Sequence, residues 1–196
     1  MTETDRDTAM EYWGFAMRKT TIAELIMAMG IWAGVPVAVQ AACNPNVTAT
    51  APDSRYTDNG DGTVTDNATG LMWKQCSEGQ STTTSPCDTG TLATYTWQGA
   101  LQRAEALNSG GGFAGYTDWR LPNRNELASL VERQCWSPAI NTNLFPVTIG
   151  FPHYWSSSPD ASNSGGAWYI TFYRGNVSSG GPGSNTRNVR LVRGGQ

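Results

Sequence analysis

Short apolar runs separated by turn dipeptides dominate the chain from residue 55 onward, a pattern that predicts strands rather than long helices. Turn residues at 59–62 (Asn-Gly and Asp-Gly) and at 67–70 bracket an extended run, which indicates a hairpin. Between 168 and 173, Trp, Ile and Phe alternate with Tyr, Thr and Tyr, as in a half-buried strand. Residues 189–193 are expected to form a closing strand.

Two segments have the period of an amphipathic helix. The first ends at the glycine-rich stretch 108–112, and its apolar face consists of Trp97, Leu101, Ala104 and Leu107. In the second, Asn123 is expected to cap a helix near 124–133, with Glu126 completing a capping box. Two short helices framed by short strands predict an α+β domain with small antiparallel sheets and long loops.

The N-terminal region has the composition of a secretory signal. Residues 17–19 (Met-Arg-Lys) are basic, an apolar run follows at 25–39, and small residues precede position 42. The apolar run is too short to span a membrane. We therefore expect a signal peptide at 17–41, with 1–16 lying upstream of the true start and 42–54 forming a polar leader.

The compartment after export stays open between the periplasm, the cell surface and the medium. Cys43 would carry a lipid if the signal were of the lipoprotein type. However, Gln40 occupies the position where that signal normally has a Leu-like residue. We therefore favour a soluble exported chain that begins near Ala42. No further transmembrane run follows the signal.

All four cysteines follow the expected cleavage site, and an even number of cysteines in an exported chain predicts disulfides. Cys76 and Cys87 bracket a polar loop and are expected to pair. Cys43 would then join the leader to Cys135. The sequence alone leaves all three pairings open. The spacing does not suit zinc, and the chain has one histidine.

Length and charge narrow the class of partner. The mature part, about 155 residues, is long enough for one domain at 55–196 with a sizeable core. The formal net charge of the whole chain is −3, so we expect no nucleic-acid partner. The charged fraction is low, at 15%, which suits an exported, loop-rich domain. The oligomeric state stays open.

The loop 58–66 carries three carboxylates within nine residues and raises the question of calcium. A helix–loop–helix calcium site needs oxygen ligands at alternate positions and a closing glutamate. Here Gly60 and Gly62 occupy alternate positions, and no glutamate follows at the required spacing. We therefore predict a hairpin turn and no metal or other cofactor. Calcium stays open through other loops, although no ligand set is identified.

Several blocks together closely resemble the Lcl C-terminal domain family. They are the segments at 55–76 (RYTDNGDGTVTDNATGLMWKQC), 94–108, 118–127 (DWRLPNRNEL), 137–146, 154–159 (YWSSSP), 167–177 (AWYITFYRGNV) and 189–196. The resemblance implies a C-type-lectin-like fold of the type also found in formylglycine-generating enzymes. It implies an exported bacterial protein. The better-understood members bind ligands at cell surfaces, so the family gives the fold more firmly than an activity.

Catalytic constellations are scarce in this sequence. His153 is the single histidine and is expected to be a packing or rim residue rather than part of a nucleophilic triad. The tryptophans of the domain are expected to pack in the core. Tyr169 and Tyr173, on the opposite face of their strand from Trp168, are the better surface candidates. We therefore expect a binding protein rather than an enzyme.

The region 160–188 is rich in short residues that form hydrogen bonds, a composition that is typical of adaptable binding loops. In the family and its fold relatives, retroelements diversify the C-terminal end of some members. The residue types in 160–188 match those found at such diversified positions. We expect the ligand to contact Asp160, Asn163, Tyr173, Arg174, Asn176, Ser178, Asn185 and Arg187.

The expected function is therefore that of an exported adhesin-like or lectin-like module for a surface glycan or protein. The two arginines, Arg174 and Arg187, would meet carboxylate or sulfate groups. Two alternatives stay open: an exported enzyme acting on cell-wall or extracellular polymer, and a structural envelope protein.

Overall fold

The computed structural model describes residues 41–84, 86–146, 148, 153–181 and 185–194. The chain divides into two units, residues 1–38 and 39–196, and the described residues all belong to the second. Except for Ala41, the predicted signal peptide and the extension before it lie outside the described residues. In the part that is described, no helix has the length and apolar character needed to cross a bilayer.

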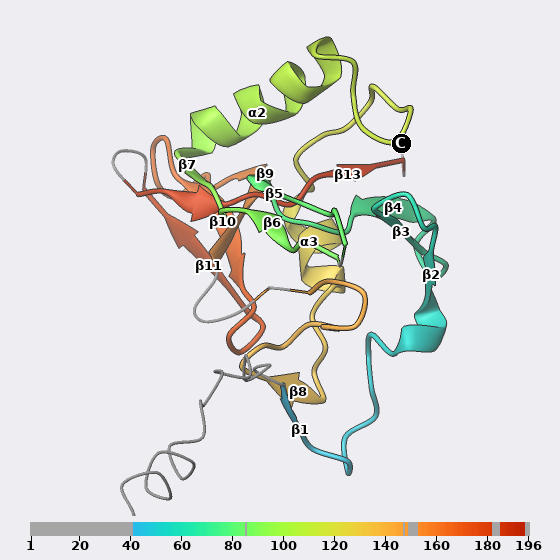
Figure 1. The fold of residues 1–196 in the computed structure, drawn as a ribbon. Helices are drawn as coiled ribbons and strands as arrows, with labels where there is room; N and C mark the ends of the chain where they lie inside the picture. The colour runs from blue at the N-terminus through green and yellow to red at the C-terminus, as the bar shows by residue number, and fades with distance from the viewer. Residues whose placement is uncertain (1–40, 85, 147, 149–152, 182–184, 195–196) are drawn as a thin grey trace, which may run out of the picture. The chain divides into compact units, whose positions relative to one another are not determined.

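The helices α2 and α3 follow one another in the chain, with short strands before and after them, which confirms the predicted mixture of α and β structure (Figure 1). The helices are α2 (Trp97–Ser109) and α3 (Arg124–Ser129), with a 3-10 turn η1 (Asp53–Arg55). The strands are β1 (Ala42–Cys43), β2 (Tyr56–Asp58), β3 (Thr63–Asp66), β4 (Leu71–Lys74), β5 (Gln80–Ser81), β6 (Thr89–Gly90), β7 (Thr94–Tyr95), β8 (Cys135–Trp136), β9 (His153–Pro159), β10 (Ala167–Thr171), β11 (Asn176–Gly180), β12 (Arg187–Asn188) and β13 (Val192–Arg193).

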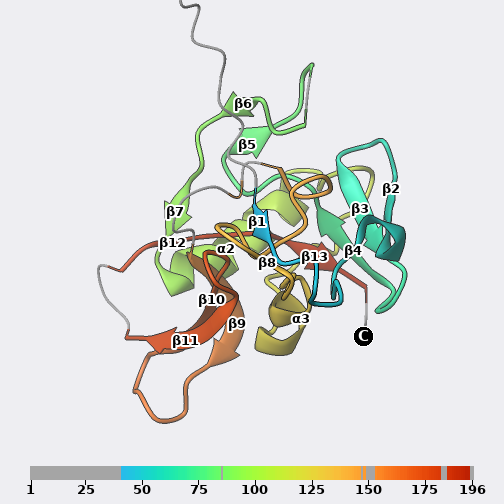
Figure 2. The same cartoon turned by 90° about the horizontal axis from the view of Figure 1, so that it is seen from below.

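Two larger sheets lie on either side of α3, as the two perpendicular views agree (Figures 1 and 2). One has the strand order β11-β10-β9-β12-β7, and the other has the order β13-β4-β3-β2. Leu127 and Leu130 at α3 are fully buried in a core that also contains Trp73 of β4 and Ile170 of β10. The short helix thus joins the two sheets by filling the space between them.

The carboxylate-rich loop forms the predicted hairpin turn between β2 and β3. Gly60 and Gly62 have φ angles of +75° and +83°, which the absence of a Cβ permits. Asp58 accepts a hydrogen bond from the Gly60 N–H at 2.9 Å, and Asp61 accepts one from the Thr63 hydroxyl at 2.6 Å. These two carboxylates therefore stabilise the turn. Among the described residues, no group of three or more His, Cys, Asp or Glu is arranged to hold a metal ion.

The capping box of α3 is confirmed, but the helix is shorter than predicted. Asn123 Oδ1 accepts from the Glu126 N–H at 2.9 Å, and the Glu126 carboxylate accepts from the Asn123 N–H at 2.8 Å. The helix ends at Ser129 rather than near residue 133. The Glu132 carboxylate accepts from the N–H groups of Thr50, Ala51 and Gln134, and these bonds need a turn where the helix would have continued.

The predicted closing strand at 189–193 is confirmed only at its end, where Val192 and Arg193 form β13; the strand before it, β12, ends at Asn188. β12 pairs with β7 and β9, whereas β13 pairs with β4. Between them, Arg190 is fully buried and donates to the carbonyls of Lys74 and Gln75 and to the hydroxyls of Ser77 and Thr148. The Nη1 and Nη2 atoms thus donate to two separate segments, whereas the buried Nε has no hydrogen-bond partner among the described residues.

Both expected disulfides are present. Cys76 pairs with Cys87 across the polar loop, and Cys43 pairs with Cys135. The second bond lies in the small β1–β8 sheet, where the two cysteines are also direct strand partners. It therefore fixes the start of the described chain against the segment that follows α3.

Candidate functional site

Three adjacent strands of the five-stranded sheet present one set of side chains away from the α3 core. Tyr169 and Thr171 of β10 lie opposite Trp155 and His153 of β9, respectively. On the other side they pair with Ser178 and Asn176 of β11. Directly paired residues project from the same face of a sheet. We call the face formed by these six residues the outer face, since the intervening Tyr154 and Ile170 point into the core.

The open part of the outer face is hollowed into a pocket of about 590 Å³. Its lining residues are Arg133, His153, Tyr169, Thr171, Gly175, Asn176, Val177 and Ser178. We call it the outer-face pocket. None of these lining residues is acidic, whereas one is an arginine and another is a histidine. The pocket is therefore suited to a ligand that accepts hydrogen bonds and carries negative charge.

Arg187 of β12 contacts one of the lining residues, Tyr169, without lining the pocket itself. Its Cζ lies 3.8 Å from the ring centroid of Tyr169 and 4.3 Å from that of Trp155. Its Nε is buried and has no hydrogen-bond partner in the described part of the chain, and no described carboxylate forms an ion pair with it. Hydrogen bonding to Ser178 and then to Arg187 lowers the pKa of Tyr169. The aromatic rings thus fix a permanent cation whose charge is left uncompensated.

His153 lies on the rim of the outer-face pocket, as predicted. The side chain is exposed, and its ring meets the Tyr169 ring edge-on with 5.2 Å between centroids. Burial of part of the imidazole and, after it, the charge of Arg187 lower the pKa of His153 below its usual 6.5. The imidazole is therefore neutral at pH 7, and it is poised to gain a proton if a bound anion offsets the charge of Arg187.

Comparison with known protein families confirms the resemblance seen in the sequence blocks. The profile of the Lcl C-terminal domain matches residues 62–193, which is more than half of the chain. The chain belongs to the Lcl C-terminal domain family. The match includes α2, α3 and every residue of the outer-face pocket, whereas β1, β2 and Cys43 precede it. Among curated proteins, none matches this sequence.

The Lcl C-terminal domain brings three of the predicted ligand-binding residues together. Asn176 and Ser178 line the outer-face pocket, and Arg187 lies beside them against Tyr169. Tyr173 and Arg174 lie in the turn between β10 and β11, where Arg174 stacks over the Tyr173 ring at 5.5 Å. These residues cluster at one end of the five-stranded sheet.

The other predicted residues lie in the loops on either side of these strands. Asp160 accepts from the N–H and the hydroxyl of Ser162, at 3.0 and 2.7 Å, and so stabilises the turn before β10. Asn163 is exposed in that turn, and Asn185 is exposed just before β12. None of the three lines the outer-face pocket.

Two residues near the pocket of this Lcl C-terminal domain were missed by sequence reasoning. Arg133 follows α3 and reaches the pocket because Val131 packs against Gly175 of the β10–β11 turn, where a Cβ would collide. Trp136 was assigned to the core with the other tryptophans, yet 50% of it is exposed. No local pattern identifies either residue, since both are positioned by contacts between distant segments.

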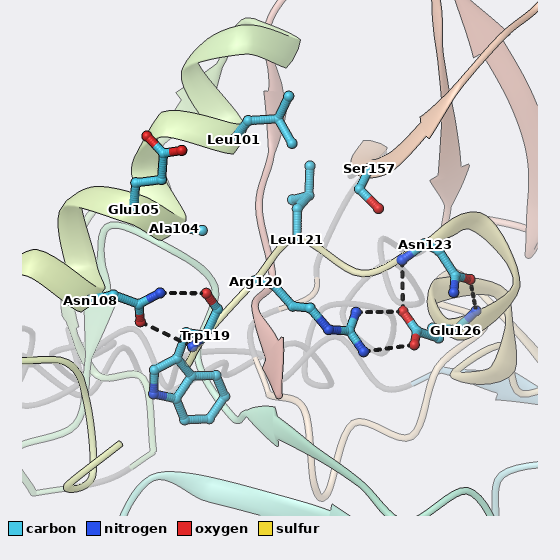
Figure 3. Close-up of a pocket in the computed structure, with 10 residues that line it drawn as sticks. All are labelled: Leu101, Ala104, Glu105, Asn108, Trp119, Arg120, Leu121, Asn123, Glu126 and Ser157. Atoms are coloured by element: carbon cyan, nitrogen blue, oxygen red, sulfur yellow. Dashed lines mark hydrogen bonds and ion pairs between the residues drawn. The ribbon is translucent and has the colours of Figure 1, made fainter. Parts of the chain in front are cut away.

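A second cavity, of about 500 Å³, lies between α2 and the segment leading into α3 (Figure 3). Leu101 and Leu121 point into it, while its polar groups are largely paired with one another. Arg120 forms two hydrogen bonds of 2.8 Å with Glu126. Asn108 bonds the N–H and the carbonyl of Trp119, at 3.0 and 2.7 Å. These pairings stabilise the groove itself and leave few groups for a ligand.

Proposed function

We propose that this protein is an exported bacterial binding module with a C-type-lectin-like fold. In this proposal, the outer-face pocket holds an anionic group of a surface glycan or protein without altering it chemically. The uncompensated guanidinium of Arg187 is the observation that carries the proposal. The two disulfides favour an oxidising compartment outside the cytosol and thereby support export.

The chemistry of Arg187 favours an anion with two neighbouring oxygen acceptors. A guanidinium presents its donors in a rigid fork that matches carboxylate and sulfate groups. Stacking on Tyr169 orients this fork before the ligand arrives, which reduces the entropy lost on binding. Burial leaves the Nε donor without an acceptor in the described part of the chain, so recognition would rely on the other donors of the guanidinium. Arg133, which lines the pocket, adds a further positive charge.

The central part of the pocket supports a ligand with several hydroxyl or amide groups. Thr171, Asn176 and Ser178 lie side by side on β10 and β11 and offer donors and acceptors over a short span. Such groups fix the orientation of a ligand, while Arg187 supplies charge recognition. A polyanionic glycan satisfies both requirements, as does an acidic protein loop. We propose no cofactor for this recognition.

Binding to charged polymers tests the proposal. The purified, oxidised protein is titrated with dextran sulfate, alginate and unmodified dextran, with and without EDTA. We expect saturable binding to the two charged polymers, no binding to dextran and no effect of EDTA. Affinity should fall as salt increases. Arg187→Gln should weaken binding by about tenfold or more, since a charge-assisted hydrogen bond contributes about 1.5–3 kcal/mol.

Arg124→Gln is the matched control, because Arg124 also stacks on an aromatic ring, that of Trp168 at 4.8 Å, but this ring, unlike that of Tyr169, does not line the pocket. It should leave the affinity unchanged. Equal losses in both variants would indicate a diffuse charge effect and overturn the assignment to the outer-face pocket. Failure of the wild-type protein to bind either charged polymer would overturn anion recognition itself.

A further inference from the structure

Trp136 differs from the other tryptophans in the part of the chain that the structure describes. Trp73, Trp119 and Trp155 are buried, and Trp97 and Trp168 are half-buried, whereas 50% of Trp136 is exposed. Exposing an indole forfeits much of the stabilisation that its burial would give, about 1.5–3 kcal/mol for a large apolar side chain. A single exposed apolar side chain is common at a protein surface, so the contacts that hold this indole in place, and not its exposure alone, are the informative feature.

Three contacts hold Trp136 in its exposed position. β8 pairs with β1 so that Trp136 lies opposite Ala42, next to the Cys43–Cys135 disulfide. The Ser137 N–H donates to the Tyr173 carbonyl at 2.8 Å. The Tyr173 ring meets the indole at 6.0 Å and 80°, which is an edge-to-face geometry. The indole is therefore ordered before any ligand binds, and the exposed part of its surface stays open.

This aromatic pair is continuous with the outer-face pocket. Thr171 and Gly175 line the pocket, and the turn between them carries Tyr173 and Arg174. Arg133 of the pocket lies three residues before Trp136 on the segment that follows α3. A ligand bound in the pocket thus has Trp136 and Tyr173 at one end of it. We call these two residues the aromatic subsite.

We propose that the aromatic subsite stacks a pyranose ring of the same glycan whose anionic group lies at Arg187. This inference rests on the proposed function and makes the ligand an oligosaccharide rather than an isolated charged group or a protein loop. The C–H groups on one face of a sugar ring carry partial positive charge and meet the negative face of the indole. The neighbouring side chains of Arg174 and Asn176 are suited to the ring hydroxyls.

A protein partner is disfavoured by the surroundings of Trp136. A stable protein interface buries about 800 Å² on each side around a core depleted of charged groups. Here a charged residue, Arg174, stacks on the Tyr173 ring that the indole contacts. The other exposed large apolar residues among those described are Val47, Tyr116 and Val177. An isolated, rigid aromatic face among hydrogen-bonding groups matches a sugar ring better than a protein surface.

The test uses oligogalacturonates of one to six units, which combine carboxylates with pyranose rings. For the full oxidised protein, affinity should increase with length by about three- to tenfold beyond the effect of added charge. Trp136→Ala should lose this gain while keeping the affinity for the single unit, and Trp136→Phe should restore part of it. Tyr116→Ala, which removes another exposed aromatic ring, is the control and should change nothing.

The outcomes separate this inference from the proposed function. If Arg187→Gln weakens binding of the single unit but Trp136→Ala keeps the full gain with length, the aromatic subsite is wrong and the anion site stands. If a neutral cellohexaose protects Trp136 from acrylamide quenching in both wild type and Arg187→Gln, the subsite is supported even where the anion site fails. Self-association abolished by Trp136→Ala would instead assign the indole to contacts between copies of this chain and overturn the inference.

Discussion

Arg187 places its guanidinium carbon 3.8 Å from the ring centroid of Tyr169, so a permanent cation lies over an aromatic ring that lines the outer-face pocket. The geometry predicts that charge alone is insufficient for recognition. Arg187→Lys keeps the charge but loses the planar fork and most of the stacking. We expect the affinity for dextran sulfate to fall nearly as far as in Arg187→Gln, by about tenfold. Wild-type affinity in the lysine variant would show that the pocket provides only a positive potential.

The neighbouring His153 predicts that binding strengthens in acid. Its pKa is lowered by burial and by Arg187, so the free protein carries a neutral imidazole at pH 7. A bound anion favours the imidazolium and raises this pKa. Affinity should therefore rise as the pH falls through the window between the bound and free pKa values, which extends downward from about neutrality.

Dextran sulfate is the suitable probe for this pH dependence, because its sulfates do not titrate in that window. Titrations at about pH 7.5 and pH 5 should show tighter binding at the lower pH. The increase should disappear in His153→Asn. The cations near His153 are Arg133 and Arg187. If the affinity of His153→Asn depended on pH as strongly as that of the wild type, another group would be titrating, contrary to the prediction.

What the sequence predicted well was local in origin. The capping box of Asn123 and Glu126 needs residues three apart, and the hairpin after Asp58 needs glycines at two neighbouring positions. Both are determined by the chain within one turn. The pairing of Cys76 with Cys87 likewise closes a short loop. Signals of this kind are complete before any tertiary contact forms.

What the sequence did not predict depends on partners far along the chain. Arg190 interrupts the closing strand because its acceptors come from residues 74–77 and 148. Trp136 stays exposed because its neighbour Cys135 is disulfide-bonded to Cys43 and because its own ring contacts that of Tyr173. Apolar periodicity assigns such residues to a regular strand or a core, since it carries no information on which distant segment lies opposite.

A buried ion pair predicts acid sensitivity of the fold. Asp66 is fully buried and accepts from Arg55 Nε and Nη2 at 2.8 and 2.5 Å. Burial by itself raises the pKa of Asp66, but hydrogen bonds from Arg55 and Thr69 outweigh it and lower the pKa below the usual value. The carboxylate thus contributes stability above its unfolded pKa of about 3.9, and this stability is lost as the pH falls through the lower, folded value.

Asp66→Asn should therefore destabilise the protein at pH 7 by roughly 3 kcal/mol, because Arg55 loses its buried partner. Urea unfolding should show this loss at pH 7 and a smaller difference from wild type near pH 3. Asp118→Asn is the matched control, since Asp118 also pairs with an arginine but its side chain is 57% exposed. It should change the unfolding midpoint little. Similar losses in both variants would mean that burial of Asp66 is not the cause.

Both disulfides are predicted to stabilise the fold, but only one of them is predicted to affect ligand binding. Cys43–Cys135 holds the segment 131–136 together with hydrogen bonds from Asn44 to the Gln134 carbonyl at 2.8 Å and from Thr50 to the Val131 carbonyl at 2.9 Å. That segment supplies Arg133 to the outer-face pocket and Trp136 to the aromatic subsite. Cys76–Cys87 closes a loop whose residues do not line the pocket.

Replacing each pair by alanine separates these roles. Loss of the bond spanning 92 residues should cost roughly 4–5 kcal/mol of stability, and loss of the bond spanning 11 residues roughly 3 kcal/mol, if chain entropy dominates. Only the Cys43/Cys135 double variant should also weaken binding of long oligogalacturonates, measured where both variants are folded. A folded Cys43/Cys135 variant with full affinity would show that strand pairing alone positions Arg133 and Trp136, because the remaining hydrogen bonds would then suffice.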